Sequence, residues 1–163
     1  MSMDHVDKIL EQWQHERPDL ETGPMEVIGR ILRLSQQLSR EMAKTFAVFD
    51  LNSASFDVLA TLRRSGPPYS LSPGDLLATT MVTSGTMTNR IDQLVKAELV
   101  ERVQNPDDGR SVTIKLSEKG FEVIDAAVTE HVQTQKNLTA GLSDKECVAL
   151  NKLHKKMLLG FKS

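Results

Sequence analysis

Between residues 72 and 120 the hydrophobic pattern changes from a helical period to the alternation of strands and back again. This order of elements constrains the fold more than any other feature of the chain. A helix start at Ser72 precedes a turn and a second helix over residues 83–97, whose apolar residues recur every three or four positions. Residues 99–103 and 112–116 are predicted as strands joined by a polar loop. The order helix, turn, helix, β-hairpin is that of a winged helix-turn-helix, which places one helix in a DNA major groove.

Helices are predicted on both sides of this stretch. Residues 3–15 have the spacing of a short amphipathic helix, and residues 23–50 of a long helix that is apolar on more than one side. After the hairpin, a break at residues 137–141 separates two further helices, and Ser143 with Glu146 forms a capping box for the second. The predicted fold is mainly α with a small β-hairpin.

This pattern divides the chain by role. We expect residues 1–22 to form an extra helix and linker, and residues 51–116 to form the DNA-binding region. Residues 23–50 and 117–163 then supply dimerisation helices, because their apolar surface exceeds what one small domain covers. The predicted assembly is a homodimer.

Composition excludes several classes of protein. No apolar run reaches the roughly 20 residues of a membrane span, and no signal segment begins the chain, so a cytoplasmic protein is expected. The single cysteine, Cys147, excludes an internal disulfide, and the four histidines show no metal-ligand spacing. No nucleophile and base form a catalytic pattern. We therefore expect neither an enzyme nor a metal or other cofactor. The net charge of −2 argues against DNA binding unless the basic residues gather on one surface.

The predicted second helix carries a small, polar outer face. Asparagine can pair with adenine, threonine can contact a thymine methyl, and the first-turn amides can accept a phosphate. An ordinary solvated helix face has a similar composition. The DNA-binding candidates on this helix are Ser84, Thr86, Thr88, Asn89 and Arg90.

The loop of the hairpin supplies two further DNA-binding candidates, Asp108 and Arg110. An arginine at a hairpin tip can enter a narrow minor groove, where the negative potential is strongest. Asp108 is expected to orient the Arg110 guanidinium by a charge-assisted hydrogen bond. The alternative is a surface ion pair of little energetic value.

Residues 108–120, with the sequence DGRSVTIKLSEKG, closely resemble the wing of the MarR family of transcriptional regulators. Residues 94–102 resemble the family's step from recognition helix to wing, and the resemblance extends from about Val27 to the end of the chain. It implies a homodimeric winged-helix repressor with terminal helices at the dimer interface. Two recognition helices then meet successive major grooves of a palindromic site, about 34–36 Å apart.

Residues 13–30 resemble the urate-responsive branch of that family, the PecS, HucR and MftR types. The resemblance implies a ligand site made by an added-helix tryptophan, a core-helix aspartate and two arginines. The matching positions are Trp13, Asp57, Arg90 and Arg102. An indole stacks on a flat ring, and guanidinium donors fit the carbonyl edge of the urate anion.

The implied switch is a competition of charges. If Asp57 pairs with Arg90 in the DNA-bound state, an anionic effector disturbs the pair and moves the recognition helix. Three alternatives stay open: phenolic effectors, a winged helix that binds protein in place of DNA, and oxidant sensing at Cys147. Xanthine and phenolic acids suit the same flat pocket.

Overall fold

The structure is a computed structural model that describes residues 2–80 and 84–161, without the side chains of residues 84 and 85. The chain divides into two compact units, Met1–Glu41 and Met42–Ser163.

The first unit consists of α1 (His5–Glu16) and most of α2 (Gly23–Ala47). Asp4 caps α1: its carboxylate accepts the N–H of Asp7, and the Asp7 carboxylate accepts the N–H of Asp4, which completes a capping box. Val6 is 5% exposed and packs at Gly29 of α2, where an added Cβ would lie 3.4 Å from a Val6 methyl group. The predicted amphipathic helix is therefore present, and it contacts α2 through its first turn.

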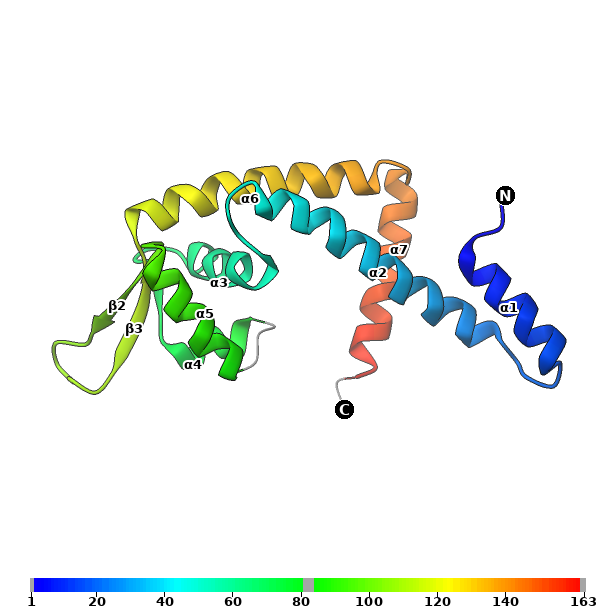
Figure 1. Ribbon diagram of the computed structural model, residues 1–163, viewed down its shortest axis with the longest axis horizontal. Coiled ribbons are helices and arrows are strands. Elements are labelled where there is room, and N and C mark those ends of the chain that lie inside the picture. Colours follow the sequence, from blue (N-terminus) through cyan, green and yellow to red (C-terminus); the bar gives the residue numbers. More distant parts are fainter. Residues whose placement is uncertain (1, 81–83, 162–163) are drawn as a thin grey trace. The chain divides into compact units, whose positions relative to one another are not determined.

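The second unit contains the predicted helices and the hairpin (Figure 1). Its elements are α3 (Ser53–Arg64), β1 (Ser70–Leu71), α4 (Pro73–Thr79), α5 (Ser84–Lys96), β2 (Val100–Gln104), β3 (Val112–Leu116), α6 (Glu118–Thr139) and α7 (Asp144–Leu159). The order α4, turn, α5, β2, β3 is the predicted winged helix-turn-helix. The fold class, mainly α with a small sheet, is confirmed.

Local side chains start four of these helices. Asn52, Ser72, Ser117 and Ser143 cap α3, α4, α6 and α7, and each side chain accepts a backbone N–H three residues later. Two predicted boundaries differ from the structure by three residues. The long helix ends at Ala47, and α6 continues to Thr139, so the expected break at residues 137–141 begins three residues late. Ser84 begins α5, and Thr83, the first residue of the predicted helix, lies outside the described residues.

The sheet has one strand more than the predicted hairpin. The strand order is β1-β3-β2, and both pairings are antiparallel. Ser70 lies opposite Lys115 and Leu71 opposite Ile114. Because β1 has only two residues, it cannot show the alternation that identifies a strand in a sequence.

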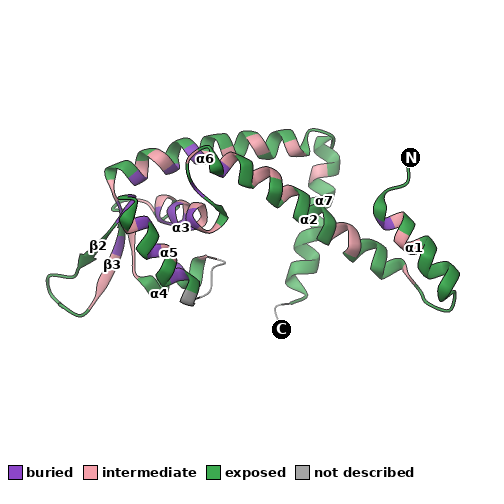
Figure 2. Cartoon of the chain, viewed as in Figure 1, coloured by how far each residue is buried: buried purple, intermediate pink, exposed green. Residues whose placement is uncertain are grey.

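The core of the second unit lies where α3, α5, β3 and the first half of α6 meet (Figure 2). The apolar face predicted for α5 is buried, since Met87, Ile91 and Leu94 are 3%, 4% and 3% exposed. Phe46 stacks on Phe56 with ring centroids 4.2 Å apart. This packing fixes one side of α5 and leaves its other side exposed.

The last helix has a different environment. α7 buries none of its residues, although its apolar side chains recur at helical spacing. No helix in the described part of the chain is both long and apolar enough to cross a membrane.

Candidate nucleic-acid interface

The outer face of α5 is exposed, as the sequence predicts. Thr86, Asn89 and Gln93 are exposed on the side opposite the buried residues. Thr88 is exposed beside them, and Ser84 begins the helix. At Thr86, Thr88 and Asn89, α5 therefore presents short polar side chains that allow a close approach to base edges.

The loop between β2 and β3 is held by its own polar side chains. The Asn105 side chain accepts the N–H of Asp107 at 3.0 Å, and the Asp108 carboxylate accepts the N–H of Arg110 at 3.0 Å. Asp108 also accepts from the hydroxyl of Ser111 at 3.4 Å. The expectation that Asp108 orients the Arg110 guanidinium is therefore corrected, because this carboxylate bonds to the loop backbone. Arg110 is exposed, and no carboxylate within the described ranges forms an ion pair with it.

An ion pair joins the recognition helix to the hairpin. Arg102 of β2 donates from Nη2 to Oδ1 of Asp92 on α5, and both side chains are about half exposed. The two residues lie ten positions apart, on either side of a turn. No helical or strand spacing links such positions, so the sequence did not indicate this pair.

Arg90 is half-buried on the same helix. Its Nη1 donates to the Gln93 side chain at 2.7 Å, while its Nε is buried with no hydrogen-bond partner in the described part of the structure. A buried N–H without an acceptor is uncommon and needs an explanation, such as a ligand or water. Asp57 is half-buried on α3, and its backbone carbonyl accepts the Thr61 hydroxyl at 2.7 Å.

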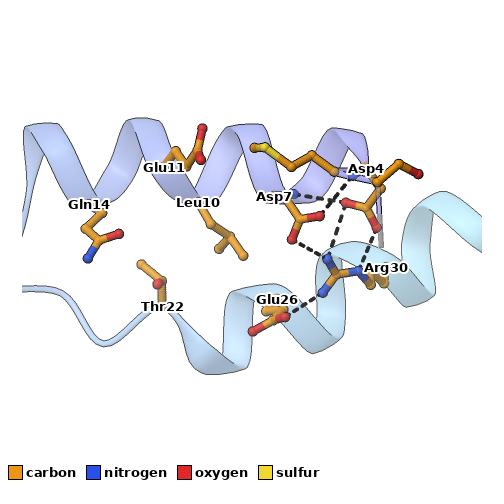
Figure 3. A pocket seen from close by; sticks show the side chains of 10 residues that line it. Asp4, Asp7, Leu10, Glu11, Gln14, Thr22, Glu26 and Arg30 are labelled. Atoms are coloured by element: carbon orange, nitrogen blue, oxygen red, sulfur yellow. Dashed lines mark hydrogen bonds and ion pairs between the residues drawn. The ribbon is translucent and has the colours of Figure 1, made fainter.

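In the first unit, Trp13 is 41% exposed on α1 and lies beside a surface hollow together with Gln12 and Glu16. A second hollow, between α1 and α2, is lined by a charged cluster (Figure 3).

Arg30 of α2 lies at the centre of that cluster. Its Nε donates to Asp4 at 2.8 Å, Nη2 to Asp7 at 2.6 Å and Nη1 to Glu26 at 2.7 Å (Figure 3). These hydrogen bonds, first from Arg30 and then from the Asp7 N–H, lower the pKa of Asp4 to about 2. The same contacts, with Asp4 first and Glu26 second, raise the pKa of Arg30. The carboxylates that cap α1 therefore also hold it to α2.

The predicted site residues thus occupy two units. Asp57, Arg90 and Arg102 belong to the second unit with the DNA-binding candidates, whereas Trp13 belongs to the first. Sequence reasoning missed the roles of Asp92 and Arg30 as ion-pair partners. The separation of four residues between Glu26 and Arg30 was a usable signal for one of these contacts.

Comparison with known proteins agrees with this geometry. The model of the MarR family matches residues 49–111, which run from before α3 into the wing loop. The chain is 39% identical over 155 residues to the HTH-type transcriptional regulator PecS of Dickeya dadantii (strain 3937), covering 95% of this chain and 90% of that protein. It is 30% identical to the multiple antibiotic resistance protein MarR of Escherichia coli (strain K12), covering 80% and 90%.

A solved structure shows the same fold. A mutant of MarR from E. coli complexed with operator DNA superposes with a TM-score of 0.70 at 27% identity, covering 90% of this chain and 97% of that chain. The extent of the match to PecS, together with the winged helix-turn-helix described above, shows that the chain belongs to the MarR family of DNA-binding transcriptional regulators.

Proposed function

We propose that the chain represses transcription by binding a palindromic operator as a homodimer, and that a small aromatic anion releases it. α5 enters the major groove through Ser84, Thr86, Thr88, Asn89 and Arg90, and Arg110 reaches the adjacent minor groove while Asp108 holds its loop. The observation that supports DNA binding is the exposed polar face of α5 beside a hairpin whose loop arginine, Arg110, has no carboxylate partner within the described residues. The similar structure of a MarR mutant complexed with operator DNA supports operator binding by this chain.

The proposed effector is urate or a related purine. The observation that supports an effector site is the buried Nε of Arg90, a hydrogen-bond donor without an acceptor among the described residues. A urate anion supplies carbonyl oxygens for Arg90 and for Arg102, and Asp57 accepts from ring N–H groups. The resemblance to the urate-responsive branch, together with 39% identity to PecS, adds Trp13 as an aromatic contact.

The effector acts by favouring a state that fits DNA poorly. An anion that binds Arg90 competes with any carboxylate near that guanidinium, Asp57 included, and so changes the forces on α5. A small rotation of α5 in each subunit is enough to spoil the spacing of about 34–36 Å between two half-sites.

A mobility-shift titration tests both halves. The probe is the DNA flanking the chain's own gene, titrated with and without urate at several salt concentrations. We expect specific binding that weakens steeply with salt, because Lys and Arg contacts displace counterions. Urate is expected to release the DNA. A winged helix that binds only protein would show no preference for this DNA over an unrelated duplex of equal length.

Arg110→Ala tests the wing. Losing one cationic contact to the DNA should weaken DNA binding about tenfold. It should also lower by about 1 the slope of log binding constant against log salt concentration. Lys136→Ala is the matched control, because it removes the same charge from the last turn of α6, about 28 Å along the helix from Ser117. Equal losses in both variants would contradict a specific role for Arg110.

Ligand titrations separate the effector classes. Trp13 is the only tryptophan, so its emission is expected to change on titration with urate or xanthine. A response to phenolic acids and none to purines would replace the purine with a phenolic effector. Saturable quenching that persists in Trp13→Phe would show that Trp13 is not the reporter.

A further inference from the structure

We infer that Asp92 competes with the effector anion for Arg102, so that it sets effector affinity and transmits ligand binding to α5. This inference rests on the proposed function, since it requires that the effector contacts Arg102. It assigns a role to a residue of the recognition helix that is neither a base-reading candidate nor one of the four residues implied to bind ligand.

In the proposed site, the Arg102 guanidinium has two possible partners, the Asp92 carboxylate and the effector anion. Arg102 lies on β2 opposite Ile114 and donates to the carboxylate of Asp92 on α5. A planar anion that takes the Nη2 edge of the guanidinium needs the N–H group that now donates to Asp92. Either the carboxylate or the ligand can be bidentate on that edge, but both cannot, so binding of the anion weakens the ion pair.

The strength of the Asp92–Arg102 ion pair limits how far it can lower the affinity for the effector. Both side chains are about half exposed, at 43% and 50%. An exposed ion pair is worth at most about a fivefold change in an equilibrium constant. Such a pair cannot block a ligand, but it lowers ligand affinity measurably. The competition therefore tunes the effector response without abolishing it.

The same ion pair links the site to DNA recognition. Asp92 is on the helix whose opposite side carries Ile91 and Leu94 into the core, so α5 is held by packing on one side and by Arg102 on another. When the anion takes Arg102, the second restraint is lost, and an uncompensated carboxylate remains on the recognition helix. Both consequences disfavour contact with DNA phosphates.

Asp92→Asn separates this role from simple structural damage. Urate affinity is measured by isothermal calorimetry, which does not depend on Trp13. We expect Asp92→Asn to bind urate about two- to fivefold more tightly, because the competing charge is gone. We also expect saturating urate to release this variant from DNA less effectively than it releases the wild type. A merely damaged protein would not gain ligand affinity.

Two comparisons complete the test. Asp125→Asn is the matched control, because it breaks an Asp–Arg pair of the same kind, with Arg63 at 3.0 Å, on α6 and α3. It is expected to leave urate affinity unchanged. In an Arg102→Gln background, adding Asp92→Asn is expected to have no effect on urate affinity, since the two groups act through one contact.

The outcomes distinguish the inference from the proposed function. If the wild type binds urate but Asp92→Asn binds it no more tightly, the inference is wrong and the proposed effector stands. Equal tightening with and without Arg102 would indicate a general charge effect and would also overturn it. If the wild type binds no urate at all, the effector proposal fails and the inference falls with it.

Discussion

Gly120, in the first turn of α6, lies directly against the backbone of Leu99. An added Cβ would fall 1.9 Å from the Leu99 carbonyl oxygen, which is far inside contact distance. The same carbonyl accepts the Ser117 N–H at 3.1 Å, so the start of α6 and the start of the hairpin share one junction. The absence of a side chain at position 120 therefore permits the wing to join the core.

Gly120→Ala is expected to destabilise the fold severely. Overpacking against side chains costs about 1–3 kcal/mol, and here the obstacle is backbone that cannot rotate away, so the loss should exceed that range. Urea denaturation measures it. Gly141→Ala is the control, because nothing lies within 4 Å of the Cβ it would add, and its stability should change little. A Gly120→Ala protein as stable as the wild type would show that the junction can open without cost.

At the scale of elements, α1 is attached to α2 by few contacts. Val6 is its one buried residue, and Arg30 joins both capping carboxylates of α1. The cap and the attachment therefore depend on the same side chains. Ordering of α1 and its packing on α2 are expected to occur together.

Replacing Arg30 by Met tests this coupling. Hydrogen exchange of the α1 amides should become faster, while the core of the second unit keeps its protection. Arg33→Met removes the same charge one turn further along α2 and should leave α1 protected. Unchanged exchange in Arg30→Met would show that Val6 alone holds the helix.

The attachment of α1 to α2 is also expected to weaken in strong acid. The pKa of Asp4 falls from its usual 3.8 to about 2 because Arg30, and then the Asp7 N–H, stabilise the charged carboxylate. Its contribution is therefore complete above about pH 4 and is lost as the pH falls through 2. Exchange of the α1 amides, corrected for intrinsic rates, should remain slow at pH 4 and rise only in stronger acid. Early loss at pH 4 would contradict this assignment.

At the scale of the whole molecule, the chain leaves much apolar side-chain surface uncovered. Leu153 is 59% exposed and Val148 68% exposed on α7, while Leu32 is 61% exposed on α2. Exposed apolar surface of this kind marks an interaction site, and the dimer proposed above gives it a partner.

The family assignment confirms the prediction that the chain is not an enzyme.

Leu153→Glu tests the role of α7 in the dimer. Burying a leucine contributes about 1.5–3 kcal/mol, and a two-fold interface contains the residue twice, so dimer affinity should fall about a hundredfold or more. Analytical ultracentrifugation measures the shift to monomer, and operator binding should weaken with it. Lys152→Glu, at the preceding position, introduces a carboxylate beside the apolar row and should have a much smaller effect. Equal effects, or none, would remove α7 from the interface.

The sequence by itself determined most elements, because their signals are local. The alternation of residues 112–116 predicted β3 to the residue, and the capping box of Ser143 and Glu146 predicted the start of α7. The residues from 108 to 120 were enough to indicate the family that the comparison with PecS confirms. The roles of Trp13 and the other proposed ligand contacts stay predictions.

The tertiary structure alone decided the contacts between residues that no local period connects. β1 is a strand only because β3 pairs with it, and Gly120 is required only because Leu99 packs against it. The sequence did not indicate that α1 places two carboxylates on Arg30, or that α5 places Asp92 on Arg102, which remains a proposed ligand contact. Helix and strand periods follow from backbone geometry, whereas these partners depend on which surfaces the packed core brings together.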